Sequence, residues 1–186
     1  RLHVRYALNI RDKYILLVYD DQIWRISLDS IKVTLDFTIP KNRTALYLTL
    51  VKGKVHQEDK IVFGEYFSNP DKKVVNIWST QVHEKSDWRI LNKFNSKEIN
   101  YVHNIICDEK SDNCYVFTGD FGDGAAIWKT SRSFKLLTTF LRGKQEYRAC
   151  WAIINNGKMS YATDTQLELN SFCKVTNKKI KNLQMI

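Results

Sequence analysis

Carboxylates recur at equivalent places in three separate segments of the chain. Each follows an apolar run and a small residue, in the pairs Gly64-Glu65, Gly119-Asp120 and Thr163-Asp164. Carboxyl groups with perturbed pKa values can act as acid and base on a glycosidic bond, bind a cation or hold sugar hydroxyls. Acidic residues at strand ends also cap turns by accepting backbone N–H bonds. We therefore take all three as candidate catalytic acids, with turn capping as the alternative.

Basic and aromatic residues are expected at the same rim. They lie in the segments "NYVH" and "EYRA" and in the loop before the second: Tyr101, His103, Arg142, Tyr147 and Arg148. A histidine can orient or move a proton, and a guanidinium binds anionic groups through paired hydrogen bonds. We expect His103 to be catalytic and the other four residues to bind substrate. An arginine that only neutralises a nearby carboxylate is the alternative.

The stretch "GDFGDG" (119–124) does not match three better-known motifs. It lacks the lysine and the following helix of a Walker loop, the His-Arg-Asp segment of a kinase, and the alternating ligands of an EF-hand. The cysteines and histidines also lack the spacing of a metal site. We therefore predict no metal site and no cofactor. We expect buried cysteines, although Cys107 and Cys114 flank a turn and a disulfide between them fits a hairpin.

The elements that would carry these residues are β-strands. Runs rich in Val, Ile, Tyr, Phe and Trp alternate with polar residues and are separated by Asn, Asp, Gly, Pro and Ser. The segment "KVTLDFTI", for example, places its apolar residues on one face, and "NNG" at 155–157 indicates a tight hairpin. The chain is therefore predicted to be all-β.

A repeat organises these strands. The segments "QIWRIS", "VNIWST", "AAIWKT" and "NSFCKV" align on Trp24, Trp78, Trp128 and Cys173, and each has an apolar strand on either side. Units of four strands at this spacing are typical of β-propeller blades. We predict a single β-propeller domain or propeller fragment over residues 1–186, with about four blades near 1–40, 41–95, 96–141 and 142–186. A jelly roll or sandwich is the alternative.

Chain direction sorts the loops of such blades onto two ends. The loops after second strands and the connections between blades share one end, and these are long and polar. They are found at 64–73, 119–124, 141–148 and 163–170. Because loops on a rigid frame carry most binding and catalytic residues, we predict the functional site at this end, near the axis.

Composition limits the range of partners. The net charge of +9 is spread along the chain, with one cluster in "TNKKIKN", which fits an ordinary solvated surface better than a nucleic-acid site. We expect a carbohydrate or anionic glycan as the partner. No apolar run is long enough for a membrane helix, and the first residues lack the features of a signal peptide. An open set of blades would expose strand edges, so we also expect further blades or a partner chain.

From Phe63 onward, the series "FGEYFSN", "VNIWST", "DWRILNKF", "CYVFTGD", "IWKTS", "GKQEYRA" and "SYATDT" resembles sialidase-like propellers with Asp-box (BNR) repeats. An Asp box lies between the third and fourth strands of a blade. Here Ser79 and Trp88 match its ends, whereas Gln81 stands at its Asp position. The resemblance implies a glycosyl hydrolase-like protein that binds a substrate carboxylate through arginines, here Arg148 with Arg142 and Arg43, and uses a tyrosine and an aspartate, here Tyr147 and Asp120.

Two functional hypotheses follow. The first is a glycan-directed propeller, a glycoside hydrolase or lyase relative with an acidic axial site. The second is a non-catalytic propeller that binds a glycan or protein partner on the same end.

Overall fold

The computed structural model describes residues 4–54 and 58–185, which form four antiparallel sheets of four strands each. The first two sheets contain β1 (Val4–Ile10), β2 (Tyr14–Tyr19), β3 (Gln22–Ser27), β4 (Val33–Thr38), β5 (Thr49–Val51), β6 (Lys60–Gly64), β7 (Val75–Gln81) and β8 (Arg89–Phe94). The other two contain β9 (Tyr101–Cys107), β10 (Asn113–Gly119), β11 (Ala126–Ser131), β12 (Thr138–Arg142), β13 (Ile153–Asn155), β14 (Lys158–Ala162), β15 (Ser171–Thr176) and β16 (Lys179–Met185).

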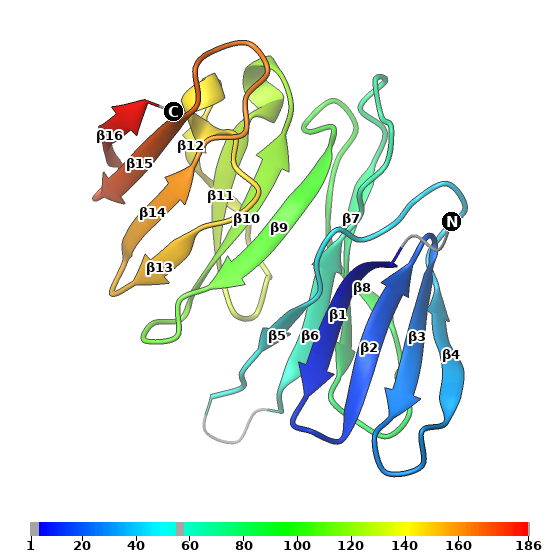
Figure 1. The fold of residues 1–186 in the computed structure, drawn as a ribbon. Helices are drawn as coiled ribbons and strands as arrows, with labels where there is room; N and C mark the ends of the chain where they lie inside the picture. Colours follow the sequence, from blue (N-terminus) through cyan, green and yellow to red (C-terminus); the bar gives the residue numbers. More distant parts are fainter. Residues whose placement is uncertain (1–3, 55–57, 186) are drawn as a thin grey trace.

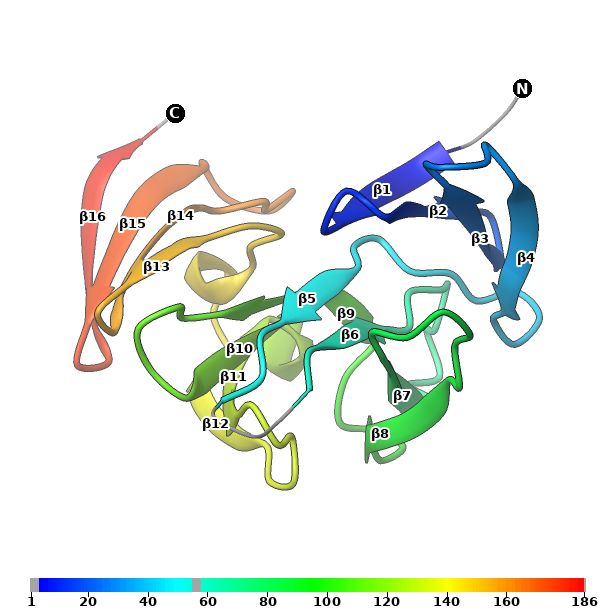
Figure 2. The ribbon, with the colours of Figure 1, turned by 90° about the horizontal axis from the view of Figure 1, so that it is seen from below.

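The four sheets are successive blades of a propeller, and they stand side by side in an arc (Figure 2). The first strand of each blade, β1, β5, β9 or β13, is innermost, and the fourth strand is outermost. Within each blade the strands follow one another in chain order. The predicted all-β propeller of four-stranded blades is therefore confirmed.

The predicted repeat is visible in the strand register. In every blade the pairing between the third and fourth strands shifts by one residue immediately before the aligned position, which is Trp24, Trp78, Trp128 or Cys173. Such a β-bulge twists the strand and redirects its side chains locally. The same bulge in all four blades shows that these residues are structural equivalents.

Apolar side chains fill the interfaces between successive blades. Trp78 of the second blade packs against Phe37 of the first, with ring centroids 5.1 Å apart. Trp128 of the third blade makes the same kind of contact with Phe94 of the second, also at 5.1 Å. Cys173 takes the equivalent place in the cluster between the third and fourth blades. Each blade is therefore held mainly by the apolar surface it buries against its neighbours.

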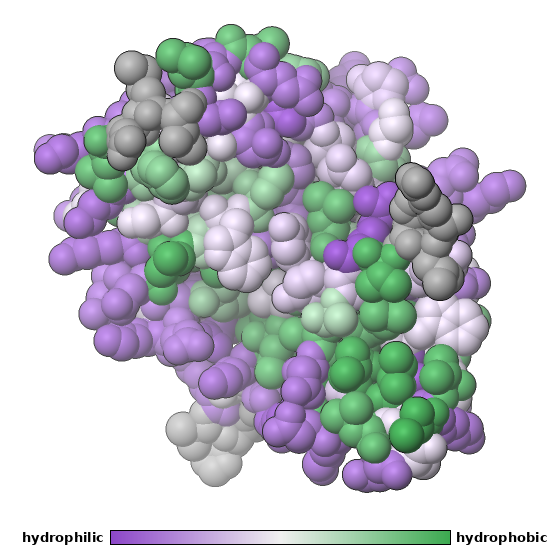
Figure 3. Space-filling view, in the orientation of Figure 1, coloured by the Kyte–Doolittle hydropathy of each residue, from purple (hydrophilic) through white to green (hydrophobic). Residues whose placement is uncertain are grey.

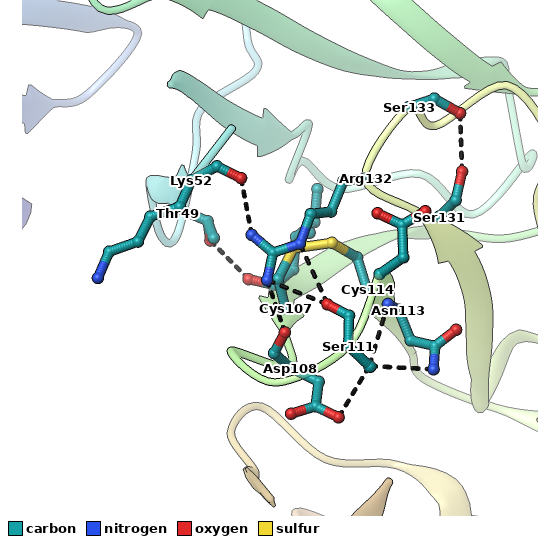
Figure 4. Close-up of a disulfide and its surroundings, with 12 residues drawn as sticks. Thr49, Lys52, Cys107, Asp108, Ser111, Asn113, Cys114, Ser131, Arg132 and Ser133 are labelled. Carbon is teal, nitrogen blue, oxygen red and sulfur yellow. Dashed lines mark hydrogen bonds between the residues drawn. A yellow bond between two sulfur atoms is a disulfide. The ribbon is translucent and has the colours of Figure 1, made fainter. Parts of the chain in front are cut away.

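A disulfide joins Cys107 and Cys114 at the end of the β9–β10 hairpin (Figure 4). The two residues pair directly across the hairpin, as the sequence allowed. Arg132 donates hydrogen bonds to the carbonyl oxygens of Asp108, Ser111 and Lys52, at 2.6, 3.2 and 2.7 Å. These bonds connect the hairpin to the second blade. The other two cysteines, Cys150 and Cys173, are free.

The loops separate onto two ends as the chain direction predicts (Figure 1). The short 3-10 segments η1 (Gly122–Gly124) and η2 (Gln145–Tyr147) lie at one end together with the β14–β15 loop. The hairpin turn that carries the disulfide lies at the other end. Within the described residues, no helix is long and apolar enough to cross a membrane.

Candidate functional site

Three of the predicted site residues meet at the loop end of the axis. His103 lies on the innermost strand β9, Asp120 follows β10, and Arg148 follows η2. The Arg148 Nη2 atom lies 2.9 Å from Asp120 Oδ1, and His103 Nε2 lies 3.7 Å from the same oxygen. The contact with Arg148 is an ion pair, whereas the histidine is too far away to hydrogen-bond to the carboxylate. We call these three residues, together with Asp164 and Cys150, the axial cluster.

His103 is a neutral imidazole with one nitrogen already engaged. Its ring is 4% exposed, and Nδ1 lies 3.2 Å from the carbonyl oxygen of Ala149, to which it donates. Burial lowers the pKa of His103 to about 4, and the positive charge of Arg148 contributes to the decrease. Because Nδ1 carries the proton, Nε2 is left as an acceptor that faces Asp120. At neutral pH His103 therefore has the protonation state of a general base.

Gly119 makes room for this imidazole. A Cβ atom at this position would lie 2.7 Å from His103 Nε2, closer than non-bonded atoms approach. The equivalent Gly64 is crowded in the same way, by Val102 of the next blade. Gly64 thus lets the innermost strand of the third blade pack closely on the second blade, whereas Gly119 makes room for a side chain of its own blade.

Arg148 has donors that the fold does not use. Its side chain is 6% exposed, yet Nε and Nη1 make no hydrogen bond to any described residue. A buried guanidinium normally has its donors satisfied, because an unsatisfied charged donor is costly. Nε and Nη1 of Arg148 are therefore buried donors that lack an acceptor, and a carboxylate is the acceptor that a guanidinium pairs with best.

Asp120 and Asp164 lie close enough to influence each other. Burial raises the pKa of Asp120, Arg148 opposes the increase, and the negative charge of Asp164 adds to it. Asp164 is exposed and accepts a hydrogen bond from the thiol of Cys150 at 3.1 Å. Burial and this carboxylate raise the pKa of Cys150 to about 12, so the thiol stays protonated at neutral pH. A protonated thiol is a weak nucleophile, so Cys150 has the surroundings of an unreactive cysteine.

Two tyrosines extend the cluster toward the second blade. The Tyr66 and Tyr101 ring centroids are 4.5 Å apart, and Tyr101 lies 5.3 Å from the His103 ring. Burial raises the pKa of Tyr66, and the nearby Asp120 raises it further, so the phenol is a neutral hydrogen-bond donor. A cavity of about 360 Å³ borders Cys150 and is otherwise lined by Val4, Arg5, Leu46 and Tyr47. Space for a ligand therefore adjoins the cluster.

Glu65 differs from Asp120 and Asp164 in how completely its carboxylate is hydrogen-bonded. It is fully buried and forms an ion pair with Arg43. Its carboxylate also accepts hydrogen bonds from the Asn76 backbone at 2.8 Å, the Asn76 side chain at 3.0 Å and the Trp78 indole at 2.9 Å. A carboxylate with four donors is committed to the fold, so we omit Glu65 from the proposed reacting groups.

Two other predicted binding residues lie outside the axial cluster. Tyr147 packs on the apolar cluster between the third and fourth blades, with the Lys144 ammonium 6.0 Å from its ring centroid. Arg142 ends the outermost strand β12, where it donates to the carbonyl oxygen of Asp123 at 3.0 Å. Of the predicted substrate-binding residues, Arg148 and Tyr101 therefore lie at the axial cluster, whereas Tyr147 and Arg142 contact other residues.

Three residues of the site were not predicted. Gln145 donates to the carbonyl oxygen of Asp120 at 2.9 Å and accepts from the Thr165 hydroxyl at 2.9 Å, which ties three loops together. Tyr66 and Cys150 were the other two. Tyr66 directly follows one acidic pair, and Cys150 lies two residues after Arg148, so proximity to the predicted residues was the available signal.

The described residues contain no group of three His, Cys, Asp or Glu side chains arranged to hold a metal ion. The acids of the axial cluster instead contact the guanidinium and the thiol.

Comparisons with known proteins support the architecture. No family model matches the chain, and no curated protein matches its sequence. A solved structure of an oligogalacturonate lyase in complex with manganese, itself a β-propeller, superposes on 94% of this chain with a TM-score of 0.61 and 12% identity. The chain spans 51% of the length of that protein. At this identity the likeness establishes the propeller fold.

Proposed function

We propose that this propeller is directed at glycans and binds an acidic saccharide at the axial cluster. The observation that carries the proposal is Arg148, whose guanidinium is buried and has two unused nitrogen donors. A sugar carboxylate would satisfy these donors once the side chains that bury them have moved aside. The structurally similar lyase, by its name, acts on oligogalacturonate, a chain of such sugars.

The same cluster offers acid/base groups beside the proposed carboxylate site. His103 is neutral and presents an unprotonated Nε2, and burial raises the pKa of Asp120 so that this acid holds its proton at higher pH than usual. Both groups can exchange protons with a bound substrate. We therefore propose a lyase or glycoside hydrolase reaction at this site, with Asp120 and His103 as catalytic residues and Arg148 as the substrate-binding residue. Tyr66 and Tyr101 would line the sugar.

Binding is tested by calorimetry with a galacturonate oligomer and with a galactose oligomer of equal length. We expect the acidic oligomer to bind and the neutral one to bind at least about tenfold more weakly, because the neutral sugar leaves the Arg148 donors unpaired. Equal affinity for both would contradict the proposed role of the carboxylate.

A sialoside is the second probe, because the resemblance to Asp-box propellers suggests this other carboxylated sugar. Preference for the sialoside over the galacturonate oligomer would support the sialidase-like interpretation. Preference for galacturonate would favour a uronate-directed protein.

Catalysis is separated from binding by Asp120→Asn. If the protein is an enzyme, the variant should retain saccharide binding and lose turnover, measured as unsaturated uronate for a lyase and as new reducing ends for a hydrolase. If wild type binds the saccharide but neither product forms, the non-catalytic alternative holds. Turnover that is unchanged in Asp120→Asn would remove this residue from the mechanism.

A further inference from the structure

The innermost strands of the first and third blades share an irregularity near their start. The pairing of β1 with β2 passes over Arg5, although the residues on both sides of it are paired. The pairing of β9 with β10 passes over His103 in the same way. Each of these residues is therefore the extra residue of a β-bulge. Bulges re-aim a side chain and are common beside active sites.

The two bulge residues are structural equivalents. Val18 and Phe117 each follow the residue that pairs with the aligned tryptophan of their blade. Val18 pairs with the residue after Arg5, and Phe117 pairs with the residue after His103. Arg5 and His103 therefore occupy the same position of the innermost strand in their two blades. Arg5 thus lies at the level of the axis at which His103 joins the axial cluster.

A cavity connects Arg5 to the axial cluster. Arg5 lines the space of about 360 Å³ that borders Cys150 of the cluster. This volume falls within the range of about 300–1,000 Å³ that is usual for small-ligand sites. Tyr47 forms another part of the wall, and its ring centroid lies 5.2 Å from that of Tyr6 in an edge-on contact. The cavity thus combines a guanidinium and an aromatic ring with one residue of the axial cluster.

Tyr66 is near both Arg5 and the arginine of the cluster. Burial raises the pKa of Tyr66 and the charge of Asp120 adds to the increase, whereas the positive charges of Arg5 and Arg148 oppose it. The Tyr66 ring centroid lies 6.3 Å from that of His103. Two guanidinium groups from different parts of the chain therefore act on one tyrosine beside the axial cluster.

The side chains around the axis suit a saccharide. Residues of intermediate hydropathy, drawn nearly white, gather in the middle of the face seen in Figure 3. Tyrosines such as Tyr6 and Tyr47 have this character, because an apolar ring carries a polar hydroxyl. Such rings can contact the apolar face of a sugar and hydrogen-bond to its hydroxyl groups.

We propose that Arg5 is a second substrate-binding residue and that the site takes two neighbouring carboxylated sugars, one at Arg148 and the next at Arg5. A guanidinium pairs with a carboxylate through two parallel hydrogen bonds, so each arginine suits one sugar carboxylate. The cavity beside Arg5 has the volume of a small-ligand site and not of a single carboxylate. This inference rests on the proposed function and extends its ligand from one acidic sugar to an oligomer of acidic sugars.

Two disaccharides that differ by one carboxylate test the second site. These are digalacturonate and a disaccharide of one galacturonate and one galactose, with affinities measured by calorimetry. Wild type should bind digalacturonate at least about tenfold more tightly, because only this ligand gives Arg5 a carboxylate to pair with. Arg5→Gln should bind both disaccharides alike, with wild-type affinity for the mixed one. Arg5 is exposed, so the variant should fold, which circular dichroism checks.

Two further variants serve as controls. Arg11→Gln removes an arginine from the turn at the other end of β1, where it pairs with Asp59, and should keep the wild-type preference for digalacturonate. Arg148→Gln removes the proposed first carboxylate site and should weaken the binding of both disaccharides.

The outcomes separate this proposal from the proposed function. A preference for digalacturonate that persists in Arg5→Gln would overturn the second site and leave the first one standing. Equal weakening of both disaccharides in Arg5→Gln would also overturn it, because Arg5 would then act on the first carboxylate. Equal binding of both by wild type would overturn the second site alone. Failure of wild type to bind either disaccharide would overturn both proposals.

Discussion

Glu65 and Asp120 occupy equivalent positions in neighbouring blades and have opposite surroundings. Each follows a glycine at the end of the second strand of its blade. Glu65 is fully buried and accepts hydrogen bonds from Asn76 and Trp78 in addition to its ion pair with Arg43. Asp120 is 18% exposed and faces an arginine with unused donors. One repeat position thus serves the fold in one blade and carries the proposed reactive group in the next.

The arginines differ in the same way. Arg43 donates to Glu65 and to the carbonyl oxygen of Val74, at 3.1 Å for the latter. Arg148 contacts Asp120 with one nitrogen and leaves two others free. The two pairs thus differ in how completely the donors of the arginine are used, and we propose that function in this repeat depends on that difference.

Glu65→Gln should cause the largest loss of stability. Removal of the charge leaves Arg43 without its ion-pair partner, and the new amide places donors against the donors of Asn76 and Trp78. We expect the free energy of unfolding to decrease by roughly 3–5 kcal/mol. Urea denaturation followed by tryptophan fluorescence measures it. A change below about 1 kcal/mol would show that the carboxylate is not structural.

Low pH should destabilise the fold through His103. Its pKa is about 4 in the folded protein and near 6.5 when unfolded, so the unfolded chain binds the proton first as the pH falls. This residue should therefore contribute a decrease of about 3 kcal/mol in unfolding free energy between pH 7 and pH 4, spread over the window between the two pKa values.

The control for this prediction is His103→Gln, which should lose that part of the pH dependence and keep the part due to other groups. Titration of the imidazole by NMR gives the folded pKa directly. A value near 6.5 would contradict the neutral, buried base.

Gly119→Ala should displace the imidazole. The added methyl group would lie within 2.7 Å of His103 Nε2, so the ring or the strand must move. We expect a loss of about 1–3 kcal/mol in stability and a change in the His103 pKa toward its solvent value. Gly157→Ala is a matched control, because a methyl group there meets open space, although its positive φ of 71° adds a backbone cost. Wild-type titration of His103 in Gly119→Ala would show that the close approach has no role.

Asp120→Asn should have the smallest effect on stability. Asparagine keeps the shape of the side chain, and removal of a partly buried charge with a raised pKa offsets the lost attraction to Arg148. We expect a change within about 1 kcal/mol, in contrast to Glu65→Gln. A decrease in unfolding free energy as large as that of Glu65→Gln would show that Asp120 is as important for stability as Glu65, which would contradict the contrast between them.

The fold could be predicted from the sequence because its signals repeat. Trp24, Trp78 and Trp128 recur with the same flanking strands and were expected to fill equivalent core positions. Trp78 and Trp128 join apolar clusters, whereas Trp24 is partly exposed. The end of the blades at which the long polar loops lie was predicted from chain direction alone. Cys173 shows the limit of this reasoning, because a thiol stands where the other blades have an indole and the interface adjusts around it.

The site was less predictable because the hydrogen-bond and ion-pair partners of each side chain come from segments far away in the sequence. Nothing local to Glu65 indicates that Asn76 and Trp78 donate to it. Tyr147 and Arg148 are adjacent in the chain, yet one enters an apolar cluster and the other turns to the axis. The backbone bend after η2 decides this outcome, and residue type does not reveal it.

The most direct test of the central claim compares saccharide binding by Arg148→Gln and Arg43→Gln. Both variants remove an arginine beside an equivalent acid. Calorimetry with a galacturonate oligomer should show binding at least about thirtyfold weaker in Arg148→Gln, and wild-type affinity in Arg43→Gln at a temperature where circular dichroism shows it folded. Wild-type affinity in Arg148→Gln, with binding lost in folded Arg43→Gln, would contradict the account.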